Sequence, residues 1–186
     1  MTKMLKSIIA GAAVLIGACF IGQTQPVQAA DDYALRLAED NQWYYYQDDE
    51  VDTAYQGLAL NEYGWWYVSD GTIDWDYAGM ALNDYGWWYV SNGTVDFNYT
   101  GMALNEYGWW YFNNGTLDFN YTGMALNEYG WWDFKNGQLD LGFTGIGSNE
   151  YGDWFFKDGR IAFEYTGSYN DGGQWYMVNS GFASKI

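Results

Sequence analysis

The sequence of 186 residues contains no histidine, one cysteine, one proline and only seven lysine and arginine residues. Without histidine, neither a Ser-His or Cys-His catalytic pair nor an imidazole metal site can form. A single cysteine excludes a disulfide framework and a cysteine-rich zinc site. The formal net charge of −17 leaves too few cations to neutralise nucleic-acid phosphates. We therefore expect no cofactor, no metal and no nucleic-acid partner.

Aromatic residues and glycine are abundant instead. Phe, Trp and Tyr make up 22% of the chain, and 24 residues are glycine. Disordered chains with high net charge are poor in aromatic residues, so this composition predicts a folded protein.

The N-terminal segment 1–29 has the organisation of a secretory signal peptide. Lys3 and Lys6 precede an apolar run over 7–21, and a small-residue region ends at Ala29, after which we expect cleavage. No later apolar run is long enough to span a bilayer. We expect a secreted or cell-surface protein with no transmembrane segment after signal removal. The alternative is a lipid anchor at Cys19, because Ile-Gly-Ala-Cys is similar to a bacterial lipobox.

The rest of the chain, 30–186, is one repeat domain with a period of 22 residues. The period is carried by glycines, in one series at positions 57, 79, 101, 123, 145 and 167. Seven copies can be counted, a divergent first one that begins near Leu35 and a last one truncated at Ile186. A fixed period of this length is typical of a solenoid, whose units bury their apolar faces only against neighbours.

Each copy contains the signals of a β-hairpin. Strand-forming residues at 65–68 and 72–77 flank Asp70-Gly71, and later copies have Asn-Gly or Asp-Gly at this place. These dipeptides supply the positive φ angles of a tight hairpin turn. Residues 79–83 are expected to be a short strand or an extended connector, and the Asn of Asn61-Glu62-Tyr63-Gly64 to start a turn. The predicted fold is therefore an all-β solenoid of tandem 22-residue β-hairpin repeats.

Turn geometry also predicts two faces. With a two- or four-residue loop, Val68 would lie opposite Ile73 and Trp66 opposite Trp75, and opposed residues share a face. The expected core face carries Trp66, Val68, Ile73, Trp75 and Tyr77, and the expected outer face carries Trp65, Tyr67, Asp74 and Asp76.

The outer face provides the candidate binding residues. Aromatic rings bind the apolar faces of sugars and attract cations, and carboxylates accept hydrogen bonds from hydroxyl groups. The predicted ligand-binding residues are Trp65, Tyr67, Trp87, Tyr89, Trp109, Tyr111, Trp131, Asp74, Asp96 and Asp118. The competing interpretation is that these rings only pack between successive hairpins.

The repeated acids could serve two other roles. A pair of carboxylates can hydrolyse glycosides, but the acid and the base need different environments, and identical repeats give identical ones. We therefore expect no enzymatic activity. Calcium between the acid columns is a further alternative, although no Asp-x-Asp-x-Asp-Gly loop is present.

The unit at 99–120, Tyr-Thr-Gly-Met-Ala-Leu-Asn-Glu-Tyr-Gly-Trp-Trp-Tyr-Phe-Asn-Asn-Gly-Thr-Leu-Asp-Phe-Asn, resembles the tandem cell-wall-binding repeats of secreted bacterial surface proteins. This group includes choline-binding and glucan-binding repeats, and the resemblance covers 35–186. It implies ligand sites between consecutive hairpins, formed by the Trp of Thr-Gly-Trp and by strand aromatics. Only the strand aromatics are present here, because the Trp position holds Leu58, Met80, Met102, Met124, Ile146 and Ser168.

The sequence thus predicts an exported, non-catalytic module that binds cell-wall polysaccharide or another extracellular glycan through repeated aromatic sites. A quaternary-amine ligand is a further option. The alternative function is a structural or protein-protein interaction solenoid, such as an adhesin or a spacer.

Overall fold

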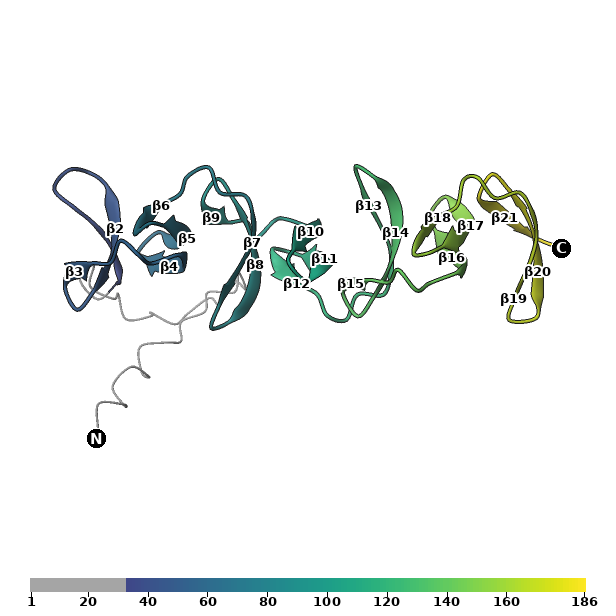
Figure 1. The fold of residues 1–186 in the computed structure, drawn as a ribbon, viewed down its shortest axis with the longest axis horizontal. Helices are drawn as coiled ribbons and strands as arrows, with labels where there is room; N and C mark the ends of the chain where they lie inside the picture. The colour runs from purple at the N-terminus through teal and green to yellow at the C-terminus, as the bar shows by residue number, and fades with distance from the viewer. Residues whose placement is uncertain (1–32) are drawn as a thin grey trace, which may run out of the picture.

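The computed structural model describes residues 33–186; the signal segment and Cys19 lie outside the described residues. Figure 1 shows a rod in which units of three short strands follow one another along the long axis. The first strands are β1 (Leu35–Leu37), β4 (Gly57–Asn61), β7 (Gly79–Asn83), β10 (Gly101–Asn105), β13 (Gly123–Asn127), β16 (Gly145–Asn149) and β19 (Gly167–Asp171). The middle strands are β2 (Trp43–Gln47), β5 (Gly64–Ser69), β8 (Gly86–Ser91), β11 (Gly108–Asn113), β14 (Gly130–Lys135), β17 (Gly152–Lys157) and β20 (Gln174–Asn179). The third strands are β3 (Glu50–Val51), β6 (Thr72–Ile73), β9 (Thr94–Val95), β12 (Thr116–Leu117), β15 (Gln138–Leu139), β18 (Arg160–Ile161) and β21 (Phe182–Lys185). The prediction of an all-β solenoid of tandem hairpin repeats is confirmed.

Two turns shape each unit, here described for the second unit, β4 to β6. The first turn is Glu62-Tyr63, between the paired residues Asn61 and Gly64. The second is Asp70-Gly71, where φ is 52° and 76°, so both residues have the left-handed geometry of a type I′ turn. The predicted Asp-Gly turn is therefore confirmed, and the segment predicted to be a strand or a connector is a strand of the longer hairpin.

The third strand is shorter than the sequence suggests. Val68 pairs with Ile73 as predicted, but the ladder ends there. Asp74 Oδ1 accepts a hydrogen bond from the amide of Asp76 at 3.1 Å, and this local turn leads the chain away from the sheet. The predicted pairing of Trp66 with Trp75 is wrong in the backbone, although the two rings still meet edge to face at 5.1 Å.

Each unit is joined edge to edge to the next. Trp66 of β5 pairs with Thr94 of β9, and the Tyr67 amide donates to the Gly93 carbonyl at 2.7 Å. A side chain at Gly93 would place its Cβ 2.5 Å from the carbonyl oxygen of Asp74. Glycine therefore serves twice at this turn, because it permits a φ of 73° and lets the turn contact the preceding unit's backbone.

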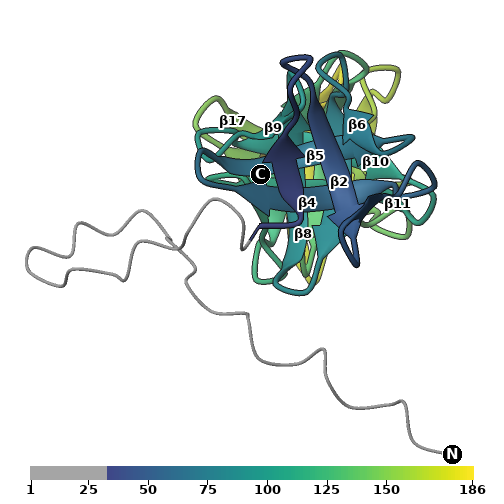
Figure 2. The same cartoon turned by 90° about the vertical axis from the view of Figure 1, so that its left-hand side faces the viewer.

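The core lies between units and uses both faces of the internal hairpins. We call the side with Ala59, Trp66 and Val68 the alanine face, and the side with Leu58, Leu60, Trp65 and Tyr67 the leucine face; the same names apply to equivalent positions elsewhere. The leucine face of one unit packs on the alanine face of the next, so that Leu58 is buried with Ala81, Val90 and Val95. Seen down the rod, the hairpins point in different directions around the axis (Figure 2).

This packing corrects the predicted faces. Trp75, assigned to the core, is 52% exposed. Tyr77 was also assigned to the core face, but its ring lies 3.5 Å from the ring of Tyr67 and nearly parallel to it. The leucine face, predicted to be outer, is covered by the following unit. The hairpin pattern alone could not show this, because it describes one unit and not its neighbours.

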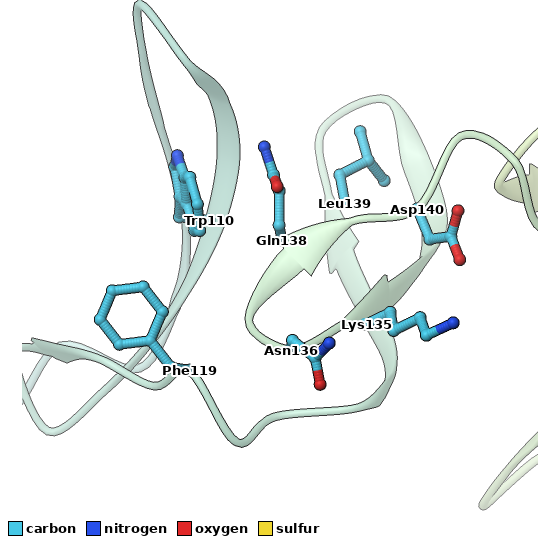
Figure 3. Close-up of a pocket in the computed structure, with 7 residues that line it drawn as sticks. All are labelled: Trp110, Phe119, Lys135, Asn136, Gln138, Leu139 and Asp140. Atoms are coloured by element: carbon cyan, nitrogen blue, oxygen red, sulfur yellow. The ribbon is translucent and has the colours of Figure 1, made fainter.

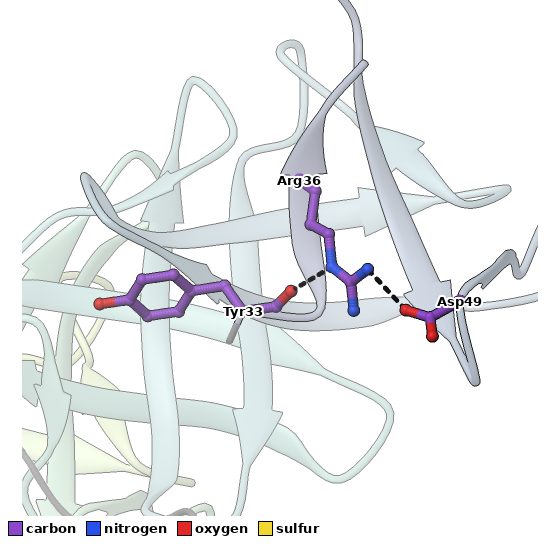
Figure 4. Close-up of polar contacts among 3 residues, drawn as sticks. All are labelled: Tyr33, Arg36 and Asp49. Atoms are coloured by element: carbon purple, nitrogen blue, oxygen red, sulfur yellow. Dashed lines mark hydrogen bonds and ion pairs between the residues drawn. The ribbon is translucent and has the colours of Figure 1, made fainter. Parts of the chain in front are cut away.

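The first unit carries the one ion pair found among residues 33–186. Arg36 Nη1 donates to Asp49 Oδ1 at 2.9 Å, and Arg36 Nε donates to the Tyr33 carbonyl at 2.8 Å (Figure 4). The Arg36 guanidinium also lies over the ring of Tyr46, 5.1 Å from its centroid. The other basic side chains of this region have no carboxylate partner.

Candidate functional site

Aromatic corners at the junctions between units are the most prominent exposed feature. In the best defined example, Trp109 on the leucine face of β11 meets Tyr129, which belongs to the Glu-Tyr turn of the next unit. The ring centroids are 6.5 Å apart and the planes are inclined by 69°. Tyr129 is 68% exposed, so only part of its ring is used in packing.

A leucine and a carboxylate complete this corner. Leu104 is paired with Trp109 across the hairpin, shares its face and is 56% exposed. Glu128 precedes Tyr129 in the same turn and is exposed. The corner therefore combines two rings at a steep angle, an exposed aliphatic side chain and a nearby negative charge.

The same arrangement recurs along the rod. Trp43 meets Tyr63 at 5.9 Å and 88°, and Trp65 meets Tyr85 at 6.0 Å and 69°. Trp131 meets Tyr151 at 6.2 Å and 66°. Three of the four predicted tryptophans, Trp65, Trp109 and Trp131, thus lie in corners, whereas Trp87 has no such ring pair within residues 33–186.

In five units an asparagine holds the first turn together with a tryptophan of the following strand. Asn105 Oδ1 accepts hydrogen bonds from the Tyr107 amide at 2.9 Å and from Trp110 Nε1 at 3.0 Å. Equivalent pairs of bonds are made by Asn61, Asn83, Asn127 and Asn149. One amide oxygen therefore sets both the turn and the neighbouring tryptophan, which confirms that this Asn starts the turn.

The predicted tyrosines are largely occupied by packing. The rings of Tyr67, Tyr89 and Tyr111 are stacked at 3.5, 3.4 and 3.5 Å on Tyr77, Tyr99 and Tyr121. The Tyr99 hydroxyl donates to the Met102 carbonyl at 2.6 Å. Burial raises the pKa of Tyr99 to about 12, and the charges of Tyr89 and Glu128 add to the effect. These rings stabilise the junction, as the competing interpretation expected.

The predicted aspartates have a structural use as well. Asp74, Asp96 and Asp118 each accept a hydrogen bond from the amide two residues later, at 3.1, 2.9 and 2.9 Å. The second carboxylate oxygen of each makes no other hydrogen bond in the structure. The acids that belong to the corners are instead the turn residues Glu62, Asp84, Glu128 and Glu150.

The predicted outer face did not include the turn tyrosines or the exposed leucines. The signal was available, because a tyrosine occupies the same turn position at 63, 85, 107, 129 and 151. A tight turn does not require a large aromatic residue, so its repetition there points to another role. Residues 33–186 contain no cluster of three or more acidic or cysteine side chains suited to a metal ion, and no helix long and apolar enough to cross a membrane.

These features define the protein as a tandem β-hairpin repeat solenoid with an aromatic corner at several junctions. The family model described as "Choline-binding repeat" matches residues 54–74, 76–96, 98–118 and 120–140. Residues 54–140 therefore carry four tandem choline-binding repeats, and the resemblance identified from the sequence is confirmed for this part of the chain.

Among solved structures, the chain is similar to the "Structure of CbpJ from Streptococcus Pneumoniae TIGR4", with 21% identity and a TM-score of 0.30. The match covers 77% of this chain and 49% of that chain, so this chain spans about half of its length. A search of curated proteins found no match.

Proposed function

We propose that the protein is an exported, non-catalytic module that attaches to choline-bearing polymers of the cell wall, and that the junction corners bind the quaternary ammonium groups. The supporting observation is the pair of steeply inclined rings, one partly buried and one exposed, as at Trp109 and Tyr129, with the exposed acid Glu128 next to Tyr129 in the same turn. Each ring contributes about 0.5 to 2 kcal/mol to cation binding. Leu104 offers an apolar contact for methyl groups.

The corner supplies an aromatic wall in place of the Thr-Gly-Trp tryptophan, which this chain lacks. Met102 occupies the position of the missing Trp and is buried between units. The turn tyrosine of the next unit supplies an aromatic wall instead. Individually weak corners suffice for attachment when several bind one polymer.

Retention on a resin that carries quaternary amine groups, with elution by free choline chloride, tests this function. We expect the wild-type protein to be retained and the double variant Tyr85→Ala/Tyr129→Ala to be eluted at a lower choline concentration. Phe163→Ala is the matched control, because Phe163 is 54% exposed but lies outside the corners. Equal elution of all three proteins would contradict the proposal.

Binding of a wall glycan is the second candidate function. It is favoured by a separate set of exposed rings that follow the third strands of their units: Trp75, Phe97 and Phe119. Neither function requires catalysis. A protein that is retained on neither a quaternary amine resin nor a wall polysaccharide would support a protein-protein interaction solenoid instead.

A further inference from the structure

A shallow hollow of about 460 Å³ lies where the fourth unit meets the Asn-Gly turn of the fifth (Figure 3). This volume falls within the range of small-molecule sites. Its lining is Trp110, Phe119, Lys135, Asn136, Gln138, Leu139 and Asp140. None of these residues belongs to the corner formed by Trp109 and Tyr129.

Two rings form one end of the hollow. Trp110 and Phe119 meet edge to face, with centroids 6.0 Å apart and planes inclined by 75°. Trp110 is held by its hydrogen bond to Asn105, whereas Phe119 is 59% exposed. An exposed phenyl ring fixed beside a tryptophan is a ready platform for an apolar ligand surface.

Polar groups of the fifth unit form the rest of the hollow. Gln138 Nε2 donates to the Tyr107 carbonyl at 3.2 Å, which leaves the Gln138 side-chain oxygen as a free acceptor. Asp140 Oδ1 accepts from the Gly142 amide, and its second oxygen has no such bond. Figure 3 shows the charged side chains of Lys135 and Asp140 at the end of the hollow away from the rings. Gln138 and Asn136 lie between these two ends.

This combination selects a neutral polyhydroxylated ligand. The positive charge of Lys135 repels a quaternary amine, and the negative charge of Asp140 repels a phosphate or a carboxylate. A sugar ring avoids both conflicts, because its C-H face stacks on rings while its hydroxyls donate to Asp140 and accept from Lys135. We propose that this hollow binds a neutral hexopyranose unit of a glycan chain. The proposal rests on the glycan-binding part of the proposed function and is independent of the corners.

Other junctions show why this one is favoured. Gln138 and Lys135 stand where the preceding unit has Thr116 and Asn113. Gln138 donates across the junction to the Tyr107 carbonyl, whereas Thr116 donates within its own unit to the Asn113 carbonyl. A smaller hollow of about 340 Å³ at Asn92 and Phe97 includes no tryptophan in its lining and no ammonium group. At Trp154 the equivalent space is taken by Phe182, whose ring lies 5.2 Å away.

A titration of the whole ¹⁵N-labelled protein with cellotetraose and with chitotetraose, followed by NMR, tests the proposal. We expect the side-chain amides of Gln138 and Asn136 to shift with one of these sugars, and the affinity to fall at least fivefold in Phe119→Ala. Lys135→Asn/Gln138→Thr should weaken binding similarly, and it introduces only residues that the preceding unit tolerates. Phe163→Ala is the control and should bind as the wild type does.

Two results would overturn the proposal. One is the absence of shifts at Gln138 and Asn136 with both tetrasaccharides, and the other is an equal loss of affinity in Phe119→Ala and Phe163→Ala. Retention on the quaternary amine resin is measured for the same variants. It should be unchanged by Phe119→Ala, so that failure of the sugar site and failure of the corners can be told apart.

Discussion

Asp133 lies opposite Met124 in the hairpin of β13 and β14, at the place that Tyr111 occupies in the preceding unit. The usual ring stack is missing here, because Asp133 has no ring to stack on Phe143, the equivalent of Tyr121. Burial, together with the neighbouring charge of Asp140, raises the pKa of Asp133 from 3.8 to about 6, while Lys135 opposes the shift. A carboxyl group thus takes part in a junction that is elsewhere aromatic.

The raised pKa predicts a pH-dependent stability. The folded state holds the Asp133 proton more tightly than the unfolded state, so its contribution is greatest below about pH 4 and is lost as the pH rises to about 6. After allowance for partial solvent exposure, we expect a loss of about 1 kcal/mol in the free energy of unfolding. Urea denaturation of the wild type and Asp133→Asn at several pH values measures it. Parallel curves for the two proteins would contradict the assignment.

The contact of the Asn-Gly turn with the preceding unit predicts that two glycine substitutions lower the stability by different amounts. Gly93→Ala places a Cβ against the Asp74 carbonyl at a positive φ, whereas Gly86→Ala has an unfavourable φ but no atom within 4 Å. We expect Gly93→Ala to cost about 2 to 4 kcal/mol and Gly86→Ala about 1 kcal/mol. Thermal unfolding followed by near-ultraviolet circular dichroism should show the larger decrease in Tm for Gly93→Ala, and the reverse order would exclude the clash as its cause.

The contribution of a stacked tyrosine to the free energy of unfolding can be divided between its ring and its hydroxyl group. Tyr77→Phe keeps the stack on Tyr67 but removes the hydrogen bond to the Met80 carbonyl, which is 2.6 Å long. We expect a loss of about 1 kcal/mol. Tyr77→Leu also removes the ring and should cost about 1 kcal/mol more. Chemical denaturation gives both values, and equal losses would show that the stack itself contributes nothing.

Several corners acting together predict a steep dependence of attachment on their number. We expect replacement of one turn tyrosine, Tyr129→Ala, to change retention on the quaternary amine resin only slightly. Successive addition of Tyr85→Ala and Tyr151→Ala should lower it more than in proportion, because simultaneous binding multiplies weak affinities. Choline concentrations at elution provide the measure, with far-ultraviolet circular dichroism as the folding control. A linear decline would indicate independent sites.

The sequence predicted the elements of the fold better than their packing. The glycine period and the Asn-Gly turns identified the units, because both depend on local backbone geometry. The stacking of Tyr67 on Tyr77 could not be predicted in this way, since Tyr77 lies in the segment that follows the end of the third strand. The hairpin pattern predicts Trp65 as a binding residue because it places Trp65 on the outer face. The exposed Tyr85 that completes its corner belongs to the next unit. Contacts between units arise from how the hairpins stack, which a pattern within one repeat does not contain.

Because the two rings of a corner come from successive units, a bound ligand would fasten those units to each other. An occupied junction should therefore resist bending and stretching more than an empty one. For a rod anchored along a polymer, mechanical load would be shared among the occupied junctions, and stiffness would follow the extent of attachment.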